Sequence, residues 1–116
     1  MEIALTAKGP GLGAWLDPEL ATCGHIMIVD DRDRFRSWPN AFGGAQVEND
    51  VVLAQRLVES GIDALITGTL SAQAYAVLRA AGIDVYLSDV DAVLTLVERV
   101  REGVLQPATE GDVATE

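Results

Sequence analysis

Cysteine and histidine each occur once in this chain, in the segment Cys23-Gly24-His25. A thiolate and an imidazole two residues apart can reach one metal centre, and soft or borderline metals accept both as ligands. Two ligands do not complete a closed zinc site, and a single cysteine cannot supply the usual four thiolates of an iron–sulfur cluster. A lone cysteine at the start of a strand is also commonly a small buried apolar side chain. Cys23 and His25 are therefore candidate metal ligands, with a core position for Cys23 as the alternative.

Two loops carry groups that suit an anionic ligand. The first, Gly9-Pro10-Gly11-Leu12-Gly13, follows an expected strand, and open α/β sheets commonly bind ligands after such strands. The second, Thr67-Gly68-Thr69-Leu70-Ser71, leads into a helix whose free N–H groups and positive dipole end attract anions. A plain loop and ordinary helix capping by Ser71 are the respective alternatives. The candidate cofactor-binding residues are Gly9, Gly11, Gly13, Thr67, Gly68, Thr69 and Ser71.

The residue types that carry most enzymatic chemistry are scarce. With one histidine and one cysteine, the chain has no Ser-His-Asp pattern and no histidine-rich metal motif. We therefore expect a binding protein rather than an enzyme. Asp30, Asp31 and Asp33 could hold a hard divalent cation, which leaves a metal-dependent hydrolase as a weaker hypothesis. A charged turn between two strands explains the same three carboxylates.

Length and composition favour a single globular domain in the cytoplasm. The chain has 116 residues, of which 49% are apolar, and no apolar run approaches the ~20 residues that cross a bilayer. The first residues lack the features of a signal peptide, and a single cysteine suits a reducing compartment. The net charge is −10 and the eight cations form no dense basic run, so we expect no nucleic-acid and no membrane partner.

The N-terminal part of the chain has the pattern of a strand followed by a hairpin. Residues 2–7 have strand composition, and residues 25–30 form a mostly apolar run that indicates a buried strand. Residues 32–38 alternate arginine with other side chains, as in a half-exposed strand that pairs with its predecessor. We expect a loop over residues 39–44.

Beyond residue 44, helices and strands alternate. Apolar residues at helical spacing are Val51, Ala54 and Val58, then Ala74, Val77, Leu78 and Ala81, then Val93, Leu96, Val97 and Val100. The expected N-caps are Asn49 or Asp50, then Ser71, then Ser88 or Asp89. The expected helix stops are Gly61, Gly82 and Gly103. Short strands are expected over residues 63–67 and 84–87.

Together these elements predict an α/β fold. Short helices between short apolar strands imply right-handed crossovers and a parallel half-sheet. The N-terminal hairpin adds antiparallel members, which gives a five-stranded mixed sheet with flanking helices. We expect one domain over residues 1–104 and a disordered acidic tail over residues 105–116, where the sequence has no periodicity.

Several segments carry a family resemblance in this order: Leu16-Asp17-Pro18, Cys23-x-His25-x-x-Ile28-Val29-Asp30, Gly61-Ile62-Asp63, Ile66-Thr67-Gly68 and Val77-Leu78-x-Ala80-Ala81-Gly82-Ile83. Over residues 1–104 the chain resembles the dinitrogenase iron–molybdenum cofactor biosynthesis family. The resemblance implies a three-layer ribonuclease-H-like fold. It also implies non-catalytic binding or carriage of an anionic metal–sulfur cluster that contains molybdenum with iron or copper. Cys23 and His25 would bind the metal, the two loops would surround the cluster, and a protein partner in cofactor assembly would complete the pathway.

Two segments differ from the family pattern. The chain has Glu19-Leu20-Ala21-Thr22 where the family usually has Arg-Phe-Gly-Arg, and Glu48-Asn49-Asp50-Val51 where it usually has Gly-Ala-Gly-Ile. These changes remove two cations and place Glu48 and Asp50 where carboxylates would repel an anion. They favour the alternative hypothesis of a cofactor-free protein-interaction or scaffold module, whose acidic surface docks a partner.

Overall fold

The computed structural model describes residues 1–40 and 48–113. Its strands are β1 (Ile3–Ala7), β2 (His25–Val29), β3 (Phe35–Pro39), β4 (Ala64–Thr67) and β5 (Asp84–Leu87). Its helices are α1 (Glu48–Glu59), α2 (Ala72–Ala80), α3 (Val93–Arg101) and the 3-10 helix η1 (Glu110–Asp112). Within the described ranges, every helix is too short or too polar to span a bilayer.

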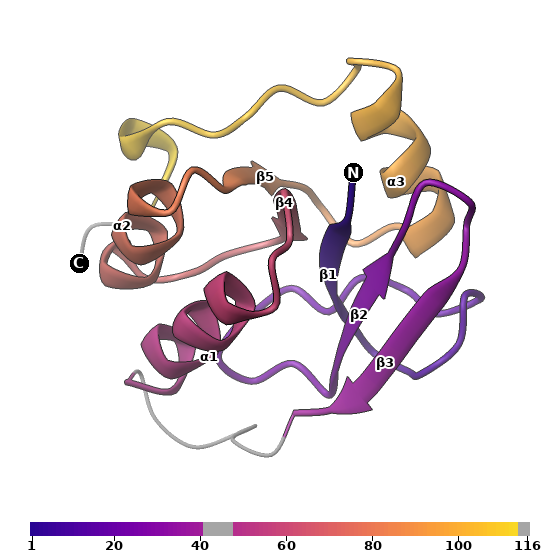
Figure 1. Cartoon of the computed structure of the whole chain (residues 1–116), viewed down its shortest axis with the longest axis horizontal. Coiled ribbons are helices and arrows are strands. Elements are labelled where there is room, and N and C mark those ends of the chain that lie inside the picture. Colours follow the sequence, from indigo (N-terminus) through magenta and orange to yellow (C-terminus); the bar gives the residue numbers. More distant parts are fainter. Residues whose placement is uncertain (41–47, 114–116) are drawn as a thin grey trace.

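β1 lies in the middle of a five-stranded sheet with the order β3-β2-β1-β4-β5 (Figure 1). β2 pairs antiparallel with β1 and β3, whereas β4 pairs parallel with β1 and β5. One end of the sheet therefore collects the last residues of four strands (Ala7, Pro39, Thr67 and Leu87) and the first residue of β2, His25. We call this end the carboxyl rim. The predicted five-stranded mixed sheet is confirmed.

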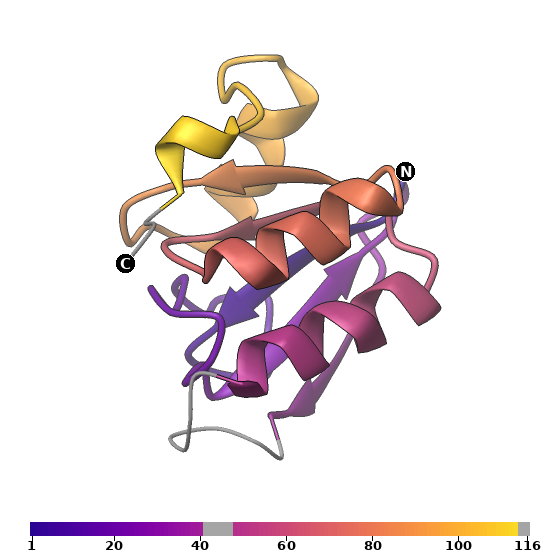
Figure 2. The same cartoon turned by 90° about the vertical axis from the view of Figure 1, so that its left-hand side faces the viewer.

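Helices cover both faces of the sheet. α1 and α2 lie side by side on one face, and α3 lies on the other (Figure 2). Neighbouring residues of one strand serve the two layers in turn, since Leu65 belongs to the core under α1 and α2 and Ile66 to the core under α3. Because both faces are covered, β1 and β4 are buried at every position, and all their residues except Thr6 and Thr67 are apolar. The expected three-layer arrangement is thus confirmed.

The helix stops follow from glycine conformation. Gly61, Gly82 and Gly103 have φ values of +74°, +81° and +76°, which L side chains rarely adopt. Each follows α1, α2 or α3 where the sequence predicts a stop. The predicted cap of α2 is also confirmed, because the Ser71 hydroxyl accepts a hydrogen bond from the Ala74 N–H at 3.1 Å.

The N-cap predicted for α3, Ser88 or Asp89, is wrong. The helix begins only after Ala92, which makes no side-chain cap, and the Ser88 hydroxyl donates to the Asp89 carbonyl instead. The chain continues to Ala92 because these residues are held by a more distant segment, in which the Leu16 N–H donates to the Asp91 carbonyl at 2.9 Å. Long-range pairing therefore delays the start of the helix.

The N-cap predicted for α1, Asn49 or Asp50, is wrong as well. The helix begins at Glu48, so both residues lie inside it. The Asp50 carboxylate binds another helix, as described below. The loop predicted after β3 falls mostly on residues 41–44, which lie outside the described residues.

The C-terminal segment packs against the sheet. The prediction of disorder is wrong for residues 105–113, which we call the C-terminal strap. The Ala108 N–H donates to the Val85 carbonyl of β5 at 2.7 Å, the Tyr75 hydroxyl donates to the Ala108 carbonyl at 3.0 Å, and Val113 is buried. β5 is an edge strand, so its outer backbone groups need hydrogen-bond partners. The C-terminal strap supplies one of them without any periodic sequence pattern from which this could be predicted.

Candidate functional site

The residues selected from the sequence gather at the carboxyl rim. The Gly9–Gly13 loop follows β1, the Thr67–Ser71 loop follows β4, and Cys23 precedes β2. His25 is the first residue of β2 and pairs directly with Ala7, the last residue of β1. The rim is therefore where the fold brings these groups together.

The Gly9–Gly13 loop contains backbone N–H groups that donate no hydrogen bond within the described part of the chain. The loop is closed by bonds at its ends and middle, such as the Ala14 N–H to the Gly11 carbonyl at 3.0 Å. In the described part of the chain, the N–H groups of Gly9, Gly11 and Gly13 donate to no other residue. A Cβ added at Gly11 or Gly13 would meet no atom within 4 Å, so there is open space beside both residues. Such amides can receive an anion.

A crossing segment, residues 16–20, separates this loop from the second one. Leu16 packs in the core under α3, whereas Leu20 packs in the core under α1 and α2. Between them, the Thr69 N–H donates to the Pro18 carbonyl at 2.7 Å, and the Leu20 N–H donates to the Thr69 carbonyl at 3.1 Å. The crossing segment therefore lies between the two loops.

Gly68 and Thr67 have internal roles. A Cβ on Gly68 would lie 2.5 Å from the Pro18 carbonyl oxygen, so the crossing segment approaches the β4 loop too closely for any side chain. The buried Thr67 hydroxyl accepts a hydrogen bond from the Thr6 hydroxyl at 2.9 Å. These groups hold the crossing segment against the strands, and their cofactor-binding role stays a prediction.

The start of α2 already holds an anion, which is the carboxylate of Asp50. Its Oδ2 accepts the Ser71 N–H at 2.7 Å, and its Oδ1 accepts the Ser71 hydroxyl at 2.9 Å. Asp50 is 3% exposed. The sequence predicts that the Ser71 end of the loop attracts negative charge, but it does not show that a carboxylate of α1 lies there.

Cys23 lies in the core under α1 and α2 and is fully buried. Burial, and secondly the nearby Asp17 carboxylate, raise the pKa of the thiol to about 12, against a smaller opposing effect from the Asn40 side chain. Asn40 Nδ2 donates to Cys23 Sγ at 3.6 Å. The thiol is therefore protonated at neutral pH, whereas metals bind the thiolate. In this conformation Cys23 occupies the core position that the sequence allowed as its alternative.

His25 is half-buried at the rim, and its Nδ1 is buried. Among the described residues, this nitrogen is the one buried side-chain nitrogen or oxygen atom without a hydrogen-bond partner. Leaving such an atom unpaired costs about 1–3 kcal/mol, so an added hydrogen-bond or metal partner at this nitrogen would be stabilising. Its position next to Ala7 places that partner beside the Gly9–Gly13 loop.

The sequence misses the loop after β5. A hollow of about 370 Å³ at the carboxyl rim is lined by Gly68, Leu87, Ser88, Asp89 and Leu105. The reason for considering the loops after β1 and β4 also applies to β5, because all three strands are parallel and end at the same rim. Applied to the third strand, that rule would have found Ser88 and Asp89.

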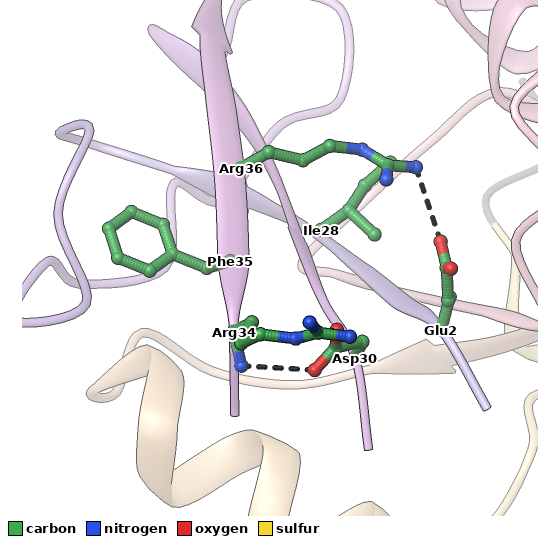
Figure 3. A pocket seen from close by; sticks show the side chains of 6 residues that line it. All are labelled: Glu2, Ile28, Asp30, Arg34, Phe35 and Arg36. Atoms are coloured by element: carbon green, nitrogen blue, oxygen red, sulfur yellow. Dashed lines mark hydrogen bonds and ion pairs between the residues drawn. The ribbon is translucent and has the colours of Figure 1, made fainter. Parts of the chain in front are cut away.

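The aspartates of the hairpin turn lie at the other end of the sheet. Asp30 accepts the N–H groups of Arg32 and Arg34 and the Arg34 side chain, and Figure 3 shows this pair beside a small hollow. Asp33 binds Arg101 at 2.7 Å. No group of three potential metal ligands occurs within the described ranges. These ion pairs form the charged turn between two strands that is the alternative to a divalent-cation site at Asp30, Asp31 and Asp33.

Comparisons with known proteins agree with this architecture. The model of the family described as dinitrogenase iron-molybdenum cofactor matches residues 1–103. The apo form of the orange protein from Desulfovibrio gigas is 31% identical, with a TM-score of 0.84 over 93% of this chain and 92% of its own. A NifB-like protein of the DUF35 family from Thermotoga is 23% identical, with a TM-score of 0.73 over 91% of each chain. No curated protein matches the chain. The predicted fold class is confirmed.

Proposed function

Because this chain belongs to the dinitrogenase iron-molybdenum cofactor family, we propose that it binds and carries an anionic metal–sulfur cluster and performs no chemistry on it. The cluster, which contains molybdenum with iron or copper, is cargo that the chain passes to a protein partner in cofactor assembly. Similarity to the orange protein supports this proposal, because the solved structure is described as the apo form, a term used for a protein without its cofactor.

The observation that carries the proposal is the unpartnered Nδ1 of His25 beside a loop of free amides. An imidazole nitrogen with a free lone pair is a metal ligand, and successive backbone N–H groups bind the negative charge of sulfides. Lys8, the one lysine of the chain, directly precedes Gly9 and is exposed. In a protein of net charge −10, this is a local concentration of groups that attract an anion.

The proposed site therefore consists of His25 and the Gly9–Gly13 loop. Cys23 joins it as a ligand only after the thiol loses its proton, because burial raises its pKa to about 12. The Thr67–Ser71 loop contributes less than the sequence predicts, since Pro18 and Asp50 already bind its Thr69 and Ser71 amides.

The test is to add tetrathiomolybdate and copper to the purified chain and to record visible spectra and molybdenum content after desalting. We expect the wild type to retain both. His25→Gln removes the proposed metal ligand, and Gly11→Val places a branched side chain in the open space beside the loop amides. Each should weaken retention about tenfold or more, which is about 1.4 kcal/mol.

Gly111→Val is the matched control for the glycine variant. Gly111 lies in η1, outside both candidate loops, and a Cβ there makes only an ordinary 3.8 Å contact with Thr109 Oγ1. We expect it to behave as the wild type does. A wild type that retains no molybdenum contradicts the proposed function, whereas retention unchanged in His25→Gln and Gly11→Val contradicts the proposed site.

A protein-interaction module without a cofactor is the second candidate. Both tryptophans of the chain are exposed, Trp15 by 53% and Trp38 by 37%, and exposed aromatic side chains are enriched at protein interfaces. A pull-down from native lysate at low and moderate salt tests this function. It predicts a partner that wild type recovers and that Trp15→Ala loses, and recovery of no partner at either salt counts against it.

A further inference from the structure

We infer that Asp50 is a built-in competitor for anionic cargo, a residue that determines which side of the crossing segment the cargo occupies. The inference rests on the proposed function and adds to it a specificity determinant within this chain. The Asp50 carboxylate takes the Ser71 N–H and hydroxyl at the start of α2, at 2.7 and 2.9 Å. A bound anion would use the same two donors.

Asp50 is not required for capping α2. The Ser71 hydroxyl oxygen already accepts the Ala74 N–H, which is the ordinary role of an N-cap side chain. The carboxylate therefore adds a negative charge to a helix end that the Ser71 hydroxyl already caps. Its contacts therefore resemble those of a ligand more than those of a cap.

The packing of α1 fixes the carboxylate in place. Asp50 is in the first turn of α1, and Leu53, Ala54 and Leu57 of the same helix belong to the core that contains α2. α1 and α2 run side by side (Figure 2). These apolar contacts hold the backbone of Asp50 close to the start of α2, and the burial of Asp50 keeps its carboxylate at Ser71. An arriving anion meets an occupied site.

Two amides of the same helix end stay available. In the described part of the chain, the N–H groups of Ala72 and Gln73 have no acceptor, and both residues are exposed. They would attract an anion if the adjacent carboxylate did not repel it. Asp50 thereby directs cargo away from the start of α2 and toward the Gly9–Gly13 loop on the other side of the crossing segment.

The test compares the wild type with Asp50→Asn and with Glu59→Gln. Asparagine can keep both contacts with Ser71 while losing the charge. Glu59 is exposed at the far end of the same helix, so its variant has the same net charge without a change at the rim. Tetrathiomolybdate, a dianion, is titrated into each protein at constant ionic strength. We expect Asp50→Asn to bind about tenfold more tightly than the other two, which is about 1.4 kcal/mol.

Sulfate supplies a readout that does not depend on cluster binding. The amide signals of Ala72 and Gln73 are followed by NMR as sodium sulfate is added, and saturable shifts are expected in Asp50→Asn alone. If Asp50→Asn behaves as Glu59→Gln does with both anions, the inference is overturned. If sulfate shifts appear in Asp50→Asn but no variant binds tetrathiomolybdate, the inference holds and the proposed function fails. Asp50→Ser, whose hydroxyl can still accept the Ser71 N–H, replaces Asp50→Asn if the latter does not fold.

Discussion

Gly68→Ala tests the closest approach of two backbone segments in this fold. The added Cβ would lie 2.5, 2.9 and 3.1 Å from the carbonyl oxygen, Cα and carbonyl carbon of Pro18. None of these atoms is the movable end of a side chain, so the crossing segment must shift. It is held there by the Thr69 N–H bond to Pro18 and the Leu20 N–H bond to Thr69. Relieving the clash therefore weakens both bonds.

The expected loss of unfolding free energy is about 3 kcal/mol. Overpacking of this kind costs about 1–3 kcal/mol, and each weakened hydrogen bond adds about 0.5–1.5 kcal/mol. Urea unfolding followed by circular dichroism measures the change, and a slope of about 1–3 kcal/mol/M puts the shift of the midpoint at about 1–3 M. Gly11→Ala is the matched control, because its Cβ meets no atom within 4 Å. If both variants unfold within about 0.5 kcal/mol of each other, the packing of Pro18 on Gly68 is not as described.

Three further outcomes are expected. The unfolded chain releases the Cys23 proton above its ordinary pKa of 9.0 whereas the folded chain holds it up to about 12, so wild-type stability falls above about pH 9 and Cys23→Ala should show a shallower fall in urea unfolding. At Asp30, desolvation raises the pKa, but the hydrogen bonds from Arg32 and Arg34 outweigh it and hold the pKa of the folded protein below 3.8. The ionised carboxylate therefore stabilises the fold above pH 3.8, and this stabilisation is lost as the pH falls through the pKa of the folded state. Asp30→Asn should accordingly lose less stability than the wild type in an acid titration. Deleting residues 105–116 should lower the free energy of unfolding by about 2–4 kcal/mol in urea unfolding, because it removes the burial of Val113 and the Ala108 hydrogen bond.

Local patterns were sufficient for much of the fold. The apolar runs of β1 and β4 and the glycines that end the helices act through neighbouring residues, and these can be read from the sequence. Ser71 was predictable for the same reason, since it caps the helix that it directly precedes. The order of strands and helices then limits the possible sheets to a few.

Contacts between distant residues were not predictable in this way. Asp50 is 21 residues from Ser71, and its position in α1 suggests a cap for its own helix rather than an anion for the next one. Pro18 meets Thr69 across 51 residues, without periodicity to indicate it. The candidate site shows the same division. The sequence located its loops at one rim, but the crossing segment that separates them and the burial of Cys23 depend on packing in three dimensions.

The central position of β1 has a consequence for how the chain is made. Of the five described strands, β1 is synthesised first, and it can pair promptly with β2, which in turn pairs with β3; all three lie within residues 1–40. Its other side stays open until β4 emerges, since Thr6 and its partner Thr67 are 61 residues apart. Parallel pairing over such a separation forms late, and an unpaired strand can capture strands from other molecules. Nascent copies are therefore most exposed to aggregation between the synthesis of the third strand and that of the fourth.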